Sequence, residues 1–157
     1  MKPAQAAAAL RVQAALGDGY EVLEFDASTR TAADAAAAIG CEVAQIAKSL
    51  LFRAADSGRP VLVIASGAVR VDEKRLSRLL GENIGRADAD FVRENSGYAI
   101  GGVPPVAHRV APVVFIDETL LELDEIWAAA GTPNAVFRLR PRELPGLTGG
   151  SFVDIAA

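Results

Sequence analysis

Cysteine, histidine and methionine each occur only once among the 157 residues of this sequence. A single cysteine excludes a disulfide framework. One cysteine and one histidine cannot provide the three or four nitrogen and sulfur ligands of a zinc site without recruiting carboxylates. One histidine also leaves a single candidate base for a serine hydrolase, and no nucleophile-elbow motif is present. We therefore expect no metal site and no cofactor.

The sequence also lacks an excess of basic residues and a sustained apolar run. Its 16 lysine and arginine residues are outnumbered by 20 aspartate and glutamate residues, and the net charge is −4. This balance argues against a protein that coats duplex nucleic acid, although a local basic pocket could hold a nucleic-acid end. Arg11, Gln13, Asp18 and Glu21 interrupt the apolar N-terminal stretch. We therefore expect no signal peptide, no membrane contact and a cytoplasmic location.

The composition that remains is typical of one folded domain. Hydrophobic residues make up 51% of the chain and charged residues 23%. No linker, repeat or block of like charge divides the sequence. A chain of this length buries a self-sufficient core. We therefore expect a single domain over residues 1–157.

Helices and strands alternate without a regular period. The apolar spacing predicts helices at 4–16, 32–39, 72–80 and 88–95 and a one-turn helix at 141–147, with Thr31 as an N-cap and acidic starts at Asp72 and Asp88. Strands are predicted at 20–25, 48–53, 61–65, 112–116, 126–130 and 135–139, and a short apolar segment at 151–155 follows the last glycines. The turn at 57–60 predicts a hairpin of the second and third of these strands. The spacing of Val43, Ile46, Ala47 and Leu50 predicts a helical face that changes into a strand near Lys48.

Two local sequences carry the functional signal. Lys48 lies within an otherwise apolar stretch, so its ammonium group either reaches the surface or lines a pocket. Residues 97–105, GYAIGGVPP, contain three glycines and two prolines. This composition excludes a regular helix or central strand and predicts a shaped loop. Free N–H groups of such a loop can bind a carboxyl-like oxygen beside a lysine.

Lys48-Ser49-Leu50-Leu51 and the loop at 97–105 together resemble the YbaK/EbsC family, freestanding relatives of the editing domain of bacterial prolyl-tRNA synthetase. The resemblance covers nearly the whole chain in length and order of elements. Lys48 matches the family's pocket lysine, Gly101 to Pro105 match its Gly-x-x-x-Pro loop, and Asp117 matches the acidic position after the loop. The resemblance implies an α+β domain with a curved, mainly antiparallel central sheet flanked by helices. Pro104 stands where several relatives carry serine or threonine, so a hydroxyl contact is absent.

The implied activity is metal-independent hydrolysis of a wrong amino acid from the 3′ end of aminoacyl-tRNA, with the tRNA for proline as the first candidate. An aminoacyl ester is already activated, so a site that orients water and stabilises an oxyanion can cleave it without a protein nucleophile. The expected catalytic groups are Lys48 and the backbone N–H groups of Gly101 and Gly102. Prolyl-tRNA synthetase and an elongation factor are further candidate partners.

Six other residues complete the expected substrate site: Tyr98, Val103, Pro104, Pro105, His108 and Asp117. Tyr98 either packs under the loop or lines the pocket. His108 either takes part as an acid, base or contact, or is structural. Asp117 either accepts N–H groups of the loop or positions the amino group of the substrate.

Cys41 is expected to be a small buried residue and Trp127 a core residue rather than a base-stacking one. Two functions compete with the deacylase. The first is a binding module that recognises the aminoacylated tRNA end or a synthetase without turnover. The second is a small-molecule esterase that does not need tRNA.

Overall fold

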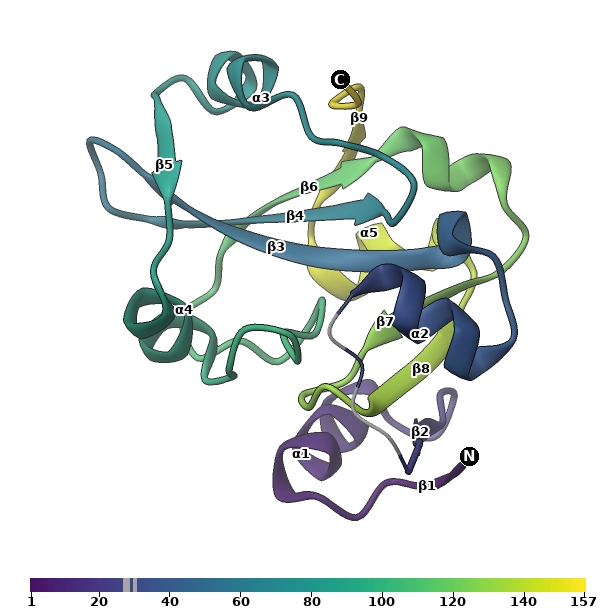
Figure 1. The fold of residues 1–157 in the computed structure, drawn as a ribbon. Helices are drawn as coiled ribbons and strands as arrows, with labels where there is room; N and C mark the ends of the chain where they lie inside the picture. The colour runs from purple at the N-terminus through teal and green to yellow at the C-terminus, as the bar shows by residue number, and fades with distance from the viewer. Residues whose placement is uncertain (27–28, 30) are drawn as a thin grey trace.

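The computed structural model describes residues 1–26, 29 and 31–157 (Figure 1). Its helices are α1 (Ala7–Leu16), α2 (Ala32–Ile39), α3 (Glu73–Leu80), α4 (Ala89–Ser96) and α5 (Leu144–Thr148). Its strands are β1 (Lys2–Pro3), β2 (Val22–Glu24), β3 (Ile46–Ala54), β4 (Pro60–Ser66), β5 (Ile84–Arg86), β6 (Val113–Asp117), β7 (Ile126–Ala129), β8 (Ala135–Leu139) and β9 (Ser151–Val153). Short 3-10 helices occupy Val43–Gln45, Glu118–Glu122 and Pro141–Glu143. No helix in the described residues is both long enough and apolar enough to span a membrane.

The described strands form one mixed sheet in the order β1-β2-β8-β7-β3-β4-β6-β9, with β5 paired to β3. The pairs β1·β2, β2·β8, β7·β8, β3·β4 and β3·β5 are antiparallel. The pairs β3·β7, β4·β6 and β6·β9 are parallel. The expected α+β fold with a mainly antiparallel sheet is therefore confirmed. The assignment of residues 1–157 to one domain stays a prediction.

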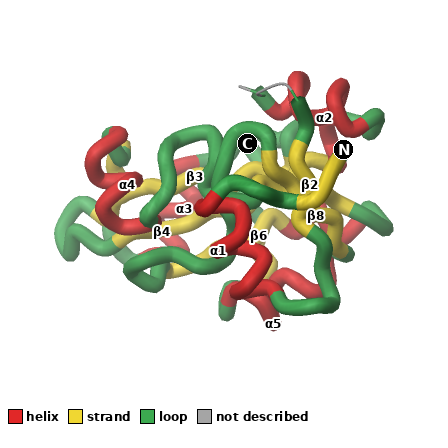
Figure 2. The backbone as a smooth tube through the Cα atoms, turned by 90° about the horizontal axis from the view of Figure 1, so that it is seen from below, coloured by secondary structure: helices red, strands yellow, loops and turns green. Residues whose placement is uncertain are grey.

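Both faces of the sheet are covered. All residues of β4 are buried, and its successive side chains enter different clusters of the core. Leu62 and Ile64 pack in one cluster, while Val63 and Ala65 pack with Leu76 of α3. This alternation follows from the two-residue period of a strand. Helices α2 and α5 lie on opposite sides of the sheet (Figure 2).

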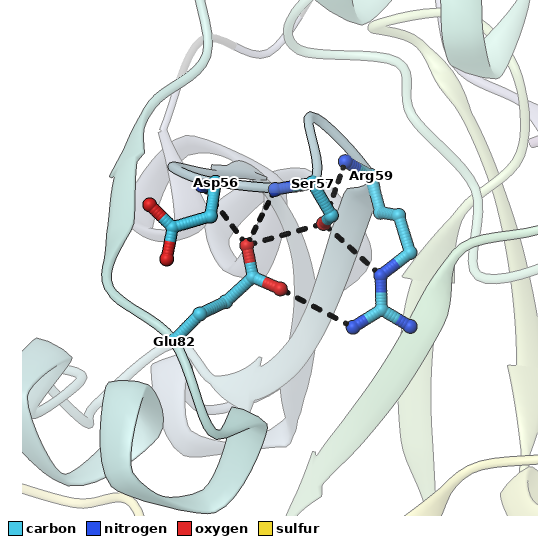
Figure 3. A network of polar contacts seen from close by, with 4 residues as sticks. All are labelled: Asp56, Ser57, Arg59 and Glu82. Atoms are coloured by element: carbon cyan, nitrogen blue, oxygen red, sulfur yellow. Dashed lines mark hydrogen bonds and ion pairs between the residues drawn. The ribbon is translucent and has the colours of Figure 1, made fainter.

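The hairpin of β3 and β4 crosses the molecule, with α3 and α4 on either side of its turn (Figure 1). Glu82 fixes this turn, because its carboxylate accepts hydrogen bonds from the backbone N–H groups of Asp56 and Ser57 and from the Ser57 hydroxyl (Figure 3). The same carboxylate lies 3.5 Å from the Arg59 guanidinium. The hydrogen bond from the Ser57 N–H is the main reason that the pKa of Glu82 is lowered. The network holds the turn against the segment that leads into β5.

The local capping predictions are confirmed. The side chains of Thr31, Asp72 and Asp88 accept N–H groups of the first turns of α2, α3 and α4. Each of these helices ends at a glycine in the left-handed conformation. The predicted loop is also confirmed, since neither a helix nor a strand lies between Ser96 and Val113.

The predicted helical face around residues 43–50 is wrong. Only Val43–Gln45 forms a helical turn, and β3 begins at Ile46. The reason is sheet pairing, because Ala47 pairs with Ser66 of β4 and Ile46 with Trp127 of β7. Tertiary contacts of this kind override local spacing when a short apolar segment fits both the period of a helix and the period of a strand. Lys48 therefore lies within a strand and not at a helix boundary.

Candidate active site

A gap in the sheet forms the floor of the candidate site. One edge of β3 pairs with β4 along most of its length. The other edge pairs with β7 at Ile46 and Ala47 and with β5 from Phe52 to Ala54. Among the described strands, none pairs with residues 48–51 on that second edge. Lys48 and Ser49 therefore lie on a stretch of strand whose outer edge is open to a ligand.

A cavity of about 280 Å³ opens over the first part of this gap. Segments far apart in the sequence line it: β3, the start of α2, the loop at 97–105, and β7 and β8 with their turn. Most of the lining is small and apolar, with alanines from α2, β3, β7 and β8. Among the described lining residues Lys48 is the one that carries a charge. The cavity therefore combines a small apolar chamber with a single cation.

Lys48 lines this cavity, and one hydrogen bond fixes its ammonium group. Its Nζ donates a hydrogen bond to the carbonyl oxygen of Val69 at 2.8 Å. Burial lowers the pKa of Lys48 below its ordinary value, and the negative charge of Asp117 opposes that shift. The lysine is thus partly desolvated and held in one direction, which strengthens its interaction with a negative charge nearby.

Asp117 acts on Lys48 through an intervening turn. The Asp117 side chain is fully buried, with Oδ2 accepting the Ser66 N–H at 3.0 Å and Oδ1 accepting the Thr119 N–H at 2.9 Å. The Ser66 carbonyl in turn accepts the N–H of Val69, whose own carbonyl holds Lys48. Of the two roles expected for Asp117, acceptance of N–H groups of the glycine loop is therefore wrong, and for the other, contact with the substrate amino group, Asp117 is not among the described lining residues of the cavity. Its carboxylate fixes the turn that positions the lysine.

The two glycines of the loop differ in what they can do. Gly101 is exposed, has a φ of 98° and lines the cavity. In the described part of the chain its N–H has no hydrogen-bond acceptor, so it remains a candidate donor to a ligand. The Gly102 N–H donates to the Ala99 carbonyl at 3.0 Å and is not free for a substrate. The expected role of Gly102 as an oxyanion donor is therefore corrected.

Gly102 instead allows the loop to pack against the turn between β7 and β8. Its carbonyl accepts the Gly131 N–H at 2.9 Å. A Cβ atom at Gly102 would lie 2.8 Å from the Cα atom of Thr132, which is closer than real Cβ contacts. Only glycine fits this approach, which places Gly101 and Val103 at the cavity.

The four remaining site residues that were expected in the loop at 97–105 differ in their position relative to the cavity. Val103 lines the cavity, whereas Pro104 and Pro105 are buried and are not among its described lining residues. Tyr98 is also absent from that lining, and 2% of its surface is exposed. Its hydroxyl donates to the Ala107 carbonyl at 3.0 Å, and the Arg11 guanidinium carbon lies 5.3 Å from the centre of its ring. Tyr98 therefore packs under the loop, which was one of its two expected roles.

His108 also holds the loop. Its Nε2 lies 2.7 Å from the Pro104 carbonyl oxygen, and because a carbonyl only accepts, Nε2 carries the hydrogen. Nδ1 is buried and has no hydrogen-bond partner in the described residues. Burial lowers the pKa of His108, which keeps the ring neutral. His108 is not among the lining residues of the cavity, so its structural role is the one that the geometry supports.

Ser49 and Trp127 line the cavity although neither was expected to contribute to the site. The Ser49 hydroxyl is buried without a hydrogen-bond partner in the described residues. Its position directly after Lys48 was the signal that could have identified it. Trp127 packs in the core beside Ile46 and Val136, as expected, and also forms part of the cavity wall.

Other reactive groups lie apart from the cavity. The described residues contain no group of three or more His, Cys, Asp or Glu side chains that could hold a metal ion. Cys41 is partly buried, and this burial raises the pKa of its thiol. It packs against a cluster of the apolar core and does not line the cavity.

Residues 26–147 match the model of the aminoacyl-tRNA editing domain family. The chain belongs to this family. The matched part of this editing domain includes β3 with Lys48, the glycine loop and Asp117. The family match therefore covers every segment that lines the cavity.

Similar proteins agree with the assignment. The protein YwhH of Bacillus subtilis is 33% identical to this chain over 124 residues, which cover 79% of this chain and 78% of YwhH. A candidate Cys-tRNA(Pro)/Cys-tRNA(Cys) deacylase, EbsC of Enterococcus faecalis, is 25% identical over 80% of this chain and 76% of its own. A crystal structure of a candidate trans-editing enzyme for prolyl-tRNA synthetase has a TM-score of 0.92 and 46% identity and covers 98% of this chain and 99% of its own. The resemblance to the YbaK/EbsC family is thereby confirmed.

Proposed function

We propose that this protein is a trans-editing deacylase that hydrolyses the ester of mischarged aminoacyl-tRNA, with the tRNA for proline as the first candidate. The observation that carries the proposal is one small apolar cavity lined by Lys48, whose ammonium is fixed by the Val69 carbonyl, and by Gly101, whose N–H has no acceptor in the described residues. The family match supports an aminoacyl-tRNA substrate. The names of EbsC and of the similar crystal structure support the link to tRNA for proline.

In the proposed reaction a water oxygen adds to the carbonyl carbon of the ester. The Gly101 N–H donates a hydrogen bond to the carbonyl oxygen as it becomes negative, and the Lys48 ammonium lowers the cost of that charge. The carbon–oxygen bond to the ribose then breaks. The ribose oxygen leaves as a hydroxyl after it takes up a proton, and the amino acid leaves as a carboxylate. A ribose hydroxyl or the substrate amino group positions the water, so neither a protein nucleophile nor a metal ion takes part.

The cavity also favours a small amino acid. Its volume of about 280 Å³ must hold the aminoacyl group beside Lys48, and its walls include six alanines together with Ile46, Trp127 and Val136. A long side chain would overlap these walls, while a positively charged one would lose its hydration and meet the like charge of Lys48. We therefore propose that alanine, serine, cysteine or threonine is removed in preference to a large residue. The discrimination among these four rests on differences of a methyl or hydroxyl group, which are each worth about 1–3 kcal/mol in a pocket.

Release of labelled amino acid from a panel of correctly and wrongly charged tRNAs tests this function. The wild type and Lys48→Ala are compared, each with and without a chelator. We expect chelator-resistant hydrolysis of a tRNA charged with a small wrong amino acid, and its loss in the variant. Binding of the charged tRNA without any hydrolysis would instead identify a binding module. Hydrolysis of simple esters as fast as of charged tRNA would identify a general esterase.

The same assay examines candidate partners. The net charge of −4 predicts weak attraction to whole tRNA and recognition of its acceptor end. Prolyl-tRNA synthetase or an elongation factor that presents this end should then raise the rate at low tRNA concentration. Tight binding of whole tRNA by the isolated protein, with a steep dependence on salt, would contradict this expectation.

A further inference from the structure

A second cavity, of about 430 Å³, adjoins the first along β3. The two cavities share part of their lining, which consists of Ser49, Leu50, Ile100, Gly101 and Val103. These five residues form a seam where the loop at 97–105 comes close to the open edge of the strand. The second cavity therefore continues the first beyond the loop, over the remainder of the gap in the sheet.

The order of residues on β3 shows how a ligand would lie across the seam. Lys48 lines the first cavity alone, and Phe52 lines the second alone. Between them, Ser49 and Leu50 line both cavities. A strand rises about 3.3 Å per residue, so Lys48 and Phe52 are about 13 Å apart along β3. A ligand that follows the strand would place one end in each cavity and its centre at the seam.

The seam presents polar groups that lack partners within the protein. The Ser49 hydroxyl is buried and has no hydrogen-bond partner in the described residues. A buried polar group is normally satisfied, so this unpaired hydroxyl indicates where a polar ligand binds. The Gly101 N–H, on an exposed residue, also has no acceptor in the described residues and is available to the same ligand. Beside them Ile100 is 62% exposed, an apolar surface that a bound ligand would cover.

The second cavity has the chemistry of a nucleoside site. Phe52 and Arg86 are directly opposite each other on β3 and β5, so their side chains lie on the same face of the sheet. An aromatic ring and a guanidinium both stack on nucleobases. Leu51 and Val92 add apolar lining, and the exposed carboxylate of Glu73 can accept a base amino group.

The segment that supplies the lining of the second cavity is more basic than the rest of the chain. Residues 48–110, which include β3, β4, β5, α3, α4 and the loop, contain ten lysine and arginine residues and seven aspartate and glutamate residues, a net charge of +3. The rest of the chain contains six and thirteen, a net charge of −7. Among the described residues that line the second cavity itself, one is a cation, Arg86, which can contact a phosphate or a base.

We propose that the second cavity binds the terminal adenosine of the tRNA 3′ end. The acyl group then occupies the first cavity, and the ribose ester lies at the seam between Ser49 and Gly101. This inference rests on the proposed deacylase function and adds the location of the nucleoside. Under this proposal Arg86, Phe52 and Glu73 bind the nucleoside and take no part in the reaction at the ester.

Mapping the binding of adenosine 5′-monophosphate by NMR on the isotope-labelled full chain tests this location without any need for activity. We expect shifts of the backbone amides of Arg86, Ala87 and Val92, and no comparable shifts at Ala32 and Ala35, which line the first cavity alone. The Arg86→Gln variant should weaken this binding. Shifts confined to the first cavity, or binding that is the same in wild type and Arg86→Gln, would overturn the proposal.

Kinetics on charged tRNA provide a second readout. Arg86 is exposed, so Arg86→Gln leaves the fold intact, and loss of one exposed ionic contact should raise KM about fivefold with kcat unchanged. Arg93→Gln is the matched control, because Arg93 is exposed on α4 and is not among the lining residues of either cavity. Equal KM values for the two variants would overturn the nucleoside site while leaving the deacylase intact. Absence of hydrolysis together with the expected NMR shifts would contradict the deacylase alone.

Discussion

Replacement of Lys48 by methionine separates the chemical role of its ammonium from any structural role. Methionine keeps an unbranched side chain of similar length in the cavity and removes the charge. If the ammonium stabilises negative charge that develops on the ester, its loss should resemble the loss of one preorganised oxyanion donor. That loss lowers kcat by about 10²–10³, or about 2.7–4 kcal/mol.

The effect of the same substitution on stability should be much smaller. The variant loses the hydrogen bond from Nζ to the Val69 carbonyl, which contributes about 1 kcal/mol. It also removes a charge that is partly desolvated, as the lowered pKa of Lys48 shows. These two effects oppose each other, so we expect the free energy of unfolding to change by less than about 1 kcal/mol. For a chain of this size, 1 kcal/mol corresponds to about 2–4 °C in Tm, so the shift should stay below that.

The assay compares single-turnover release of labelled amino acid with thermal unfolding for wild type, Lys48→Met and Lys74→Met. Lys74 is exposed on α3 and does not appear in the lining of the cavities, so its variant controls for the loss of one positive charge. We expect full activity from Lys74→Met. The proposed mechanism would be refuted by a Lys48→Met enzyme that hydrolyses at the wild-type rate. A loss of activity matched by a large fall in Tm would assign Lys48 a structural role.

The lowered pKa of Lys48 also predicts a dependence on pH. Once spontaneous hydrolysis is subtracted, wild-type activity should fall in the alkaline range at a pH below the ordinary lysine value, because the ammonium loses its proton there. Stability changes in the opposite direction. The folded state releases this proton at a lower pH than the unfolded state, so the wild type should gain stability across that interval. Lys48→Met should show neither change.

Three further predictions concern the residues that shape the site. Gly102→Ala should destabilise the protein by about 1–3 kcal/mol and lower activity, because its Cβ would meet the Thr132 backbone, whereas Gly146→Ala, with open space around it, should be neutral in thermal melts. Because burial lowers the pKa of His108, wild-type stability should fall as the pH drops through and below the ordinary value of 6.5. His108→Gln keeps a donor for the Pro104 carbonyl and should lack this loss. The same acid dependence of stability in the variant would contradict the structural role of a neutral, buried His108. Asp117→Asn replaces one acceptor by a donor and should lower the free energy of unfolding by about 1–3 kcal/mol. The variant also removes the negative charge that opposes the lowering of the Lys48 pKa, so the alkaline limb of the activity profile should shift to lower pH. An unmoved limb would refute the effect of Asp117 on Lys48.

The sequence alone was sufficient for features that depend on neighbouring residues. Thr31, Asp72 and Asp88 cap their helices because a short side chain with an oxygen reaches an N–H group three residues later. The loop at 97–105 could be predicted because glycine frees the backbone and proline restricts it wherever they occur. Lys48 could be selected as a candidate because a charge within an apolar stretch either reaches the surface or lines a pocket, and the family resemblance favoured the pocket.

The assignment of roles within the site needed the tertiary structure. Gly101 and Gly102 are equivalent in sequence, but only the fold shows that the Gly102 N–H is already donated to Ala99. Asp117 follows a strand as expected, but its partners are Ser66 and Thr119, and the glycine loop is not among them. The start of β3 at Ile46 also depends on pairing with Trp127, which is 81 positions away. Such contacts cannot be read from local spacing.

Sequence by itself therefore determined which residue types could carry chemistry in this protein: one lysine, a glycine-rich loop, and too few cysteines and histidines for a metal centre built from them. Local backbone preferences and local hydrogen bonds follow directly from the order of residues. Only the tertiary structure decided that β3 leaves an open edge between β7 and β5 and that two cavities meet there at Ser49 and Gly101. The physical reason is that a cavity is made by side chains from distant segments, whose meeting depends on the packing of the whole sheet.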